Sequence, residues 1–160
     1  MTIKTDAYSV QEFKQLQHEE FAFMTCASFE ERVFSVPQCF ANALIKKSYV
    51  FATNATDKIV ENCATLQQLL GKNALVKNIT KNDPFSYIRC FNEAISETIF
   101  EGCRNLYIDI TTFNHEMLLI LLKAIDKKKE LFTSIKFLYN GAKEYSIGDK
   151  SENKWLCFTS

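Results

Sequence analysis

The stretch LYIDITTFNHEMLL, residues 106–119, changes from an apolar run to polar side chains and back again. Five of its polar members could do chemistry, since they are a carboxylate, two hydroxyls, an amide and an imidazole: Asp109, Thr111, Thr112, Asn114 and His115. Asp109 follows apolar residues, and a buried carboxylate needs hydrogen-bond partners because its desolvation is costly. An aspartate with a histidine can act as a general acid–base pair. In a purely structural interpretation, Asp109 ties down a neighbouring loop and the polar residues after it cap a helix.

Two further polar clusters follow apolar runs. In TCASFEER, residues 25–32, Ser28 and Arg32 could bind a phosphate or a ribose through hydroxyl and guanidinium hydrogen bonds. In ATNATD, residues 52–57, Asn54 could contact a ribose or a base, although a helix cap explains the residues after it. No G-x-G-x-x-G or G-x-x-x-x-G-K motif is present, so neither a dinucleotide fingerprint nor a P-loop is predicted.

The elements that would position these clusters alternate along the chain. Short apolar runs predict strands, and apolar residues at helical spacing predict longer helices. The strands are predicted over residues 21–29, 48–54, 73–80, 104–111 and 133–141, with a sixth over 154–160. The helices are predicted over 55–72, 83–102 and 114–130, and Pro37 can start a further helical turn, with Phe40, Ala43 and Leu44 at helical spacing.

This alternation predicts an α/β fold, a three-layer Rossmann-like sandwich with a mainly parallel five- to six-stranded sheet. Residues 1–160 form one domain, with residues 1–20 as a polar lead-in that includes a short helix. The strand at 73–80 carries Lys77 in its middle and is expected nearer an edge. Because parallel strands point the same way, the polar clusters should gather at the carboxyl edge of the sheet, where open α/β folds bind ligands.

Composition argues against several classes of function. Nineteen basic and nineteen acidic residues leave no net charge, which argues against bulk binding of nucleic acid or of an anionic membrane. No stretch has the ~20 apolar residues of a membrane span, and the N-terminus does not resemble a signal peptide. The six cysteines form no C-x-x-C pair, so we expect free thiols in the cytoplasm and neither a zinc site nor another cofactor. The apolar segment 154–160 is either a final edge strand or the point where a longer protein continues.

The segment IDITTFNHEMLL resembles the ligand-sensing Rossmann domains of CRISPR-associated ring-nuclease and effector proteins, in which an apolar strand ends in Asp-x-Thr before a polar turn and a helix. CASFEER, residues 26–32, is similar to Rossmann-like proteins found near bacterial defence genes. The resemblance implies binding of a cyclic oligoadenylate across a homodimer interface by the loops after the first and fourth strands. The matching positions are Ser28, Asp109, Thr111 and Thr112. Thr112-Phe113 stands where that family usually has a glycine.

Three functions follow from these observations. The first is a nucleotide-type ligand sensor or regulatory domain in anti-phage defence, whose ligand is held by Ser28, Arg32, Asn54, Asp109, Thr111 and Thr112. The second is a hydrolase of a nucleotide or nucleoside, with Asp109 as base or nucleophile and His115 or Glu31 assisting. The third is a non-catalytic scaffold that a partner domain or chain completes.

Overall fold

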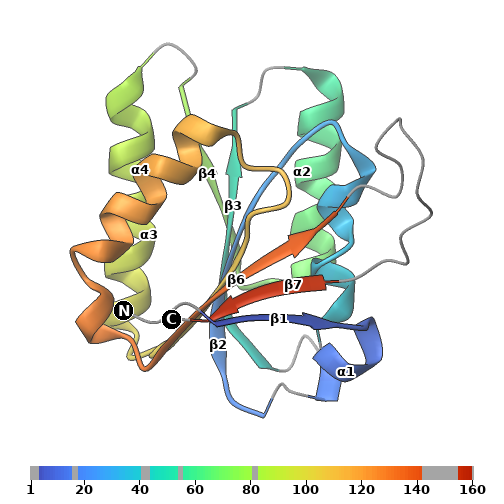
Figure 1. The fold of residues 1–160 in the computed structure, drawn as a ribbon. Helices are drawn as coiled ribbons and strands as arrows, with labels where there is room; N and C mark the ends of the chain where they lie inside the picture. The colour runs from blue at the N-terminus through green and yellow to red at the C-terminus, as the bar shows by residue number, and fades with distance from the viewer. Residues whose placement is uncertain are drawn as a thin grey trace.

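Seven strands form one sheet in the computed structural model, which describes residues 4–15, 18–40, 44–53, 56–80, 83–141 and 155–159 (Figure 1). The strands are β1 Lys4–Tyr8, β2 Phe21–Cys26, β3 Ile45–Ala52, β4 Ala74–Asn78, β5 Asn105–Asp109, β6 Ser134–Asn140 and β7 Trp155–Thr159. Their order in the sheet is β1-β7-β6-β5-β2-β3-β4. The strands β2 to β6 are parallel to one another, whereas β7 is antiparallel to β6, and β1 is antiparallel to β7.

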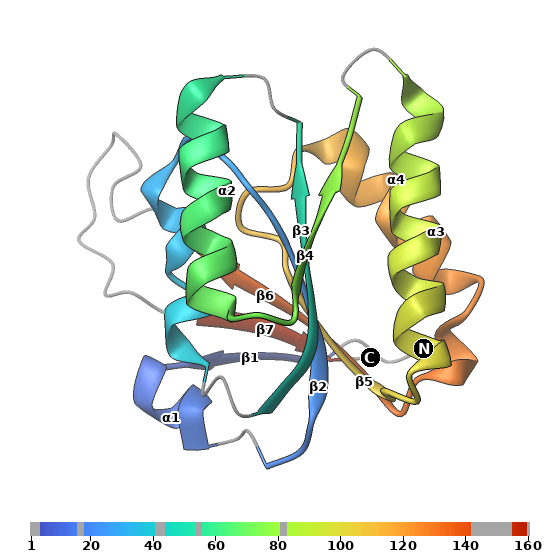
Figure 2. The ribbon, with the colours of Figure 1, turned by 180° about the vertical axis from the view of Figure 1, so that it is seen from behind.

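Helices cover both faces of the parallel part, as the predicted three-layer Rossmann-like fold requires (Figure 2). The α-helices are α1 Val10–Gln15, α2 Asp57–Leu70, α3 Pro84–Phe100 and α4 His115–Asp126. Short 3-10 turns lie at Glu31–Phe34, Pro37–Cys39 and Lys129–Leu131. The helices α1 and α2 and the first two 3-10 turns pack on one face of the sheet, and α3 and α4 pack on the other. In the described ranges, no helix is both long enough and apolar enough to cross a membrane.

The central strand β2 shows why this sheet needs two covered faces. All six of its residues are buried, and successive side chains point to opposite sides. Phe21 and Phe23 join the core under α2, whereas Ala22 and Met24 join the core under α3 and α4. An apolar run without polar alternation is typical of a strand that is covered on both faces.

Side-chain caps begin the helices where the sequence predicts them. Thr56 Oγ1 accepts a hydrogen bond from the backbone N–H of Ile59 at the start of α2. Asn114 Oδ1 accepts one from the backbone N–H of Met117 at the start of α4. Each cap satisfies one of the N–H groups that a helix leaves without a partner in its first turn.

The structure extends the predicted sheet at one side. The five parallel strands and the edge position of β4 are confirmed, and the predicted sixth strand is present as the antiparallel β7. It is not an edge strand, because it pairs with β6 on one side and with β1 on the other. The lead-in at residues 1–20 contains the predicted short helix α1, but it also contains β1, which sequence reasoning missed. β1 has polar residues at three of its five positions, Lys4, Thr5 and Asp6, and it is recognisable as a strand only through its pairing with β7.

The segment between β2 and β3 is less helical than predicted. Pro37 does start a helical turn, but this 3-10 turn ends at Cys39, and Phe40 is extended with φ −85° and ψ 142°. The ring of Phe40 packs 4.9 Å from that of Phe21 and 4.7 Å from that of Phe23, measured between centroids. Burial of this ring favours the extended backbone of Phe40 over a further turn of helix. Ala43 lies outside the described residues.

Candidate functional site

The order of the parallel strands reverses between β2 and β5. In chain order these strands run 5-4-1-2-3 across the sheet, which read from the other edge is the 3-2-1-4-5 order of the first five strands of a doubly wound Rossmann sheet. The chain leaves β2 towards the face covered by α2, and it leaves β5 towards the face covered by α4. The carboxyl ends of β2 and β5 therefore flank the position where open α/β sheets bind ligands.

Asp109 is the last residue of β5 and is completely buried. Its Oδ1 accepts a hydrogen bond of 3.0 Å from the backbone N–H of Thr111, and its Oδ2 accepts one of 3.3 Å from Thr25 Oγ1 on β2. Desolvation raises the pKa of Asp109 to about 6, against the opposing effects of these hydrogen bonds and of the Arg32 charge. Asp109 thus joins β5 to β2 from inside the sheet.

Two threonine hydroxyls connect the loop after β5 to both neighbouring strands. Thr111 Oγ1 accepts a hydrogen bond of 3.0 Å from the backbone N–H of Asn140, the last residue of β6. Thr112 Oγ1 donates one of 2.6 Å to the backbone carbonyl of Cys26, the last residue of β2. The ends of three adjacent strands are therefore held in one arrangement by the side chains of a single turn.

Phe113 anchors the same loop in the core. Its ring centroid lies 6.2 Å from that of Phe51 on β3 and 6.2 Å from that of Phe91 on α3. Burial of an aromatic ring stabilises the turn without requiring the backbone freedom of a glycine. At this position the loop is fixed by side-chain packing.

The loop after β2 is held by polar contacts. Ser28 Oγ accepts a hydrogen bond of 3.3 Å from the backbone N–H of Glu30, and the Ser28 carbonyl accepts one of 2.7 Å from Asn62 Nδ2 on α2. Arg32 donates to the Glu30 carboxylate through Nε at 2.9 Å and through Nη2, and its Nη1 donates to the Asn140 carbonyl at 3.2 Å. The paired carboxylate is the main cause that raises the pKa of Arg32.

Five of the predicted site residues therefore meet at this corner of the sheet: Ser28, Arg32, Asp109, Thr111 and Thr112. Asn54 lies outside the described residues. His115 is exposed at the first position of α4, and the two carboxylate oxygens of Asp109 bond to Thr111 and Thr25 rather than to an imidazole. Glu31 is exposed on its 3-10 turn.

Sequence reasoning missed two asparagines of this corner. Asn62 is 3% exposed although it lies in α2 among apolar residues, and an amide on the buried side of a helix is a signal that sequence can show. Asn140 contributes both its backbone N–H and its carbonyl. Backbone groups carry no residue-specific signal, so only the fold could reveal that role.

The side chains of the corner divide into a buried and an accessible set. Asp109 and Thr111 are buried, whereas Ser28, Arg32 and Thr112 are partly exposed. Phe29 is 65% exposed beside them. The accessible set offers hydroxyl, guanidinium and aromatic groups, which suit a ligand with phosphate, ribose and a flat base.

The described residues do not favour a metal site or a reactive thiol at this corner. Across the described ranges, no group of three or more His, Cys, Asp or Glu residues could hold a metal ion. Cys26 is a buried free thiol beside the corner. Desolvation and the nearby Asp109 charge raise its pKa to about 12, so it stays protonated and poorly nucleophilic.

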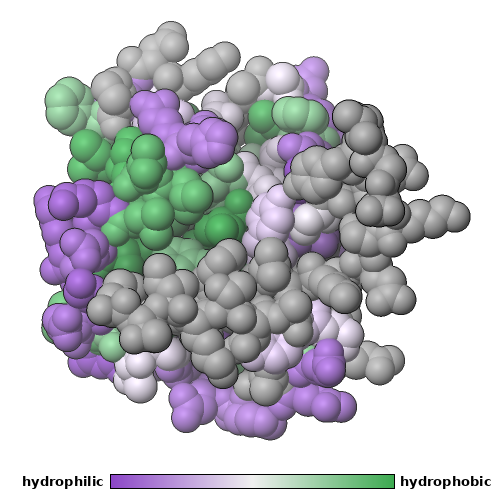
Figure 3. All heavy atoms as spheres, viewed as in Figure 1, coloured by the Kyte–Doolittle hydropathy of each residue, from purple (hydrophilic) through white to green (hydrophobic). Residues whose placement is uncertain are grey.

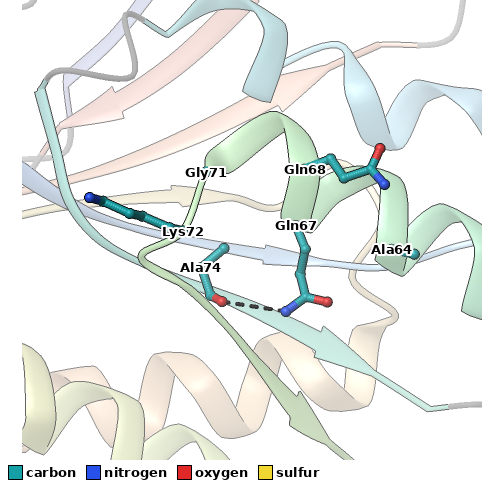
Figure 4. A pocket seen from close by; sticks show the side chains of 6 residues that line it. All are labelled: Ala64, Gln67, Gln68, Gly71, Lys72 and Ala74. Carbon is teal, nitrogen blue, oxygen red and sulfur yellow. Dashed lines mark hydrogen bonds between the residues drawn. The ribbon is translucent and has the colours of Figure 1, made fainter.

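A separate hollow of ≈ 450 Å³ lies away from this corner, where α2 ends and β4 begins (Figure 4). It is lined by Ala64, Gln67, Gln68, Gly71, Lys72 and Ala74. Gln67 Nε2 donates a hydrogen bond of 3.5 Å to the Ala74 carbonyl across it. Its position at the amino end of β4 is opposite to the edge where α/β sheets bind ligands.

No protein-family model matches this chain, and no curated protein matches it either.

Proposed function

We propose that this chain is a sensor or regulatory domain that binds a nucleotide-type ligand at the carboxyl ends of β2 and β5. The observation that carries the proposal is the hydrogen-bonded corner at the point where the strand order reverses. A network that holds three strand ends in place gives the accessible groups a fixed geometry before a ligand arrives, and such preorganisation lowers the cost of binding.

In this proposal the corner residues have two roles. Asp109 and Thr111 are positioning residues, because both are buried and bond to neighbouring strands. Ser28, Arg32 and Thr112 would contact the ligand, with the Arg32 guanidinium on a phosphate. A homodimer and a place in cytoplasmic anti-phage defence belong to the same proposal, and they are supported by the resemblance at residues 108–119.

The ion pair between Arg32 and Glu30 gives the proposal a specific consequence. An incoming phosphate competes with the Glu30 carboxylate for the guanidinium and is repelled by that carboxylate. The arginine should therefore favour binding, and the glutamate should oppose it. Opposite effects from two adjacent groups are not expected of a merely structural ion pair.

A hydrolase that uses Asp109 has less support. The carboxylate has no exposed surface, and both of its oxygens accept hydrogen bonds from Thr111 and Thr25. A general base must come within hydrogen-bond reach of the proton that it removes. Asp109 would reach a substrate only if β5 and the loop after it separated.

Isothermal titration calorimetry with mononucleotides, dinucleotides and cyclic oligonucleotides tests the proposal. We expect heat with at least one member, a loss of about tenfold or more in affinity for Arg32→Ala, and a gain in affinity for Glu30→Gln. Arg89→Ala is the matched control, because Arg89 forms a carboxylate pair with Asp83 at 2.6 Å at the start of α3. The proposal is wrong if no ligand gives heat, or if the affinity is the same in Arg32→Ala as in Arg89→Ala.

A further inference from the structure

The outward side of α4 is apolar where a surface helix is normally polar. Leu119 is 68% exposed and Leu122 is 39% exposed, and the partly exposed Leu118 adjoins them. Figure 3 shows a broad hydrophobic area over α4, left of centre in the view. Single exposed apolar residues are ordinary, but a contiguous apolar patch marks an interaction surface.

Charged and titratable residues border this leucine stripe at both ends of α4. Glu116 and His115 lie in the first turn, and Lys123 and Asp126 lie in the last turn. All four are exposed. Glu116 and Lys123 are two helical turns apart, so they project from the same side of the helix.

This arrangement is complementary to itself. Two α4 helices packed parallel about a two-fold axis would place Glu116 beside Glu116 and Lys123 beside Lys123. An antiparallel pair instead places Glu116 of each helix beside Lys123 of the other, and His115 beside Asp126. The leucines then form the centre, with Leu119 of each helix against Leu122 of the other.

We propose that α4 is a homodimer interface at which a second copy of this chain packs antiparallel across the Leu119–Leu122 stripe. A two-fold contact uses the same patch on both copies, so each charge pair forms twice. The absence of net charge on the chain removes long-range repulsion between the copies.

This interface gives the homodimer of the proposed function a specific surface, and it does not depend on the ligand site. The candidate site adjoins the amino end of α4. Antiparallel pairing places the two sites at opposite ends of a helix pair about 18 Å long. Each ligand would then be bound by one chain. The homodimer of the proposed function would therefore form through α4, and this replaces the binding across an interface that the resemblance implies.

Sedimentation velocity of the full chain without added nucleotide, over a range of protein concentrations, tests the interface. We expect a monomer–dimer equilibrium whose affinity falls about tenfold or more in Leu119→Lys. Val60→Lys is the matched control, because Val60 is 50% exposed on α2 and lies away from the stripe. A chain that stays monomeric at every concentration overturns the proposal, as does a dimer that Leu119→Lys and Val60→Lys affect equally.

Charge exchange tests the antiparallel arrangement. Glu116→Lys and Lys123→Glu should each weaken the dimer, because each places like charges together. The double variant restores opposite charges and should recover much of the lost affinity. If the double variant is weaker than either single variant, the copies do not pack in this arrangement.

Discussion

The polar clusters at the ends of β3 and β5 contain similar residue types, but they make different contacts in the structure. After β3, Thr56 caps α2 through its own hydroxyl, and Asp57 is exposed in the first turn. At the end of β5, Asp109 is buried in the sheet and bonds to Thr25, a residue far away in the chain. One cluster is a local helix start, and the other connects strands.

The position in the sheet explains this difference. β3 lies between β2 and β4, within a part of the sheet where consecutive strands are neighbours. β5 lies beside β2 at the point where the strand order reverses, so its end faces a strand and a loop from much earlier in the chain. The same residue types thus become capping groups in one place and a long-range network in the other.

Of the variants that test this difference, Asp109→Ala should lower the free energy of unfolding the most. It leaves the buried Thr111 N–H and the Thr25 hydroxyl without their acceptor, and each such loss costs about 1–3 kcal/mol. We expect the free energy of unfolding, measured by urea denaturation, to fall by about 3 kcal/mol. Asp57→Ala is the control and should change it by less than about 0.5 kcal/mol. Equal losses for the two variants would mean that the two clusters do not differ.

The pH dependence of stability is a second test of the difference between the two clusters. Burial raises the pKa of Asp109 from 3.8 to about 6, so between these values the folded protein binds its proton more tightly than the unfolded chain does. The Asp109 contribution is therefore fully present below about pH 4, and it is lost as the pH rises through about 6. The loss is on the order of 3 kcal/mol for a shift of about two pKa units.

Asp109→Asn isolates this effect. The amide keeps an oxygen for the Thr111 N–H and can donate to Thr25 Oγ1, but it does not titrate. Urea denaturation of both proteins from pH 4 to 8 should show wild type losing stability relative to Asp109→Asn as the pH rises. A difference that stays constant with pH would show that the carboxyl group has an ordinary pKa in the folded protein.

Thr56→Ala should give the smallest of these effects. It removes one hydrogen bond to the backbone N–H of Ile59 at an exposed helix start, which costs about 1 kcal/mol. Thr56→Ser keeps an acceptor and should stay close to wild type in the same denaturation measurement. A loss for Thr56→Ala as large as that of Asp109→Ala would give the cluster after β3 a role beyond its own helix.

Local patterns were sufficient to predict most of the elements. The apolar run of β2, the spacing of apolar residues in α2 and the caps at Thr56 and Asn114 all depend on near neighbours in the chain. The sequence also singled out Asp109, because a carboxylate in an apolar strand requires partners. Its partner on β2 could not be deduced, since that contact depends on which strands are adjacent.

The remaining differences between the predictions and the structure also come from contacts between residues that are far apart in the chain. Phe40 is extended because its ring packs among Phe13, Phe21 and Phe23, which come from other elements. Arg32 reaches Asn140 only because β6 ends beside the loop after β2. Tertiary packing outweighs local propensity at such positions, and propensity alone is a weak guide there.

The pairing of β1 with β7 has a consequence for the order of folding. β1 precedes every other described strand in the chain, yet its partner in the sheet is the last described strand. During synthesis β1 lacks its partner strand until the five parallel strands and their helices have been made. Closing so long a loop carries an entropy cost, and contacts of high sequence separation slow folding. We therefore expect β1 to join the sheet late and to remain exposed to solvent and to chaperones until β7 arrives.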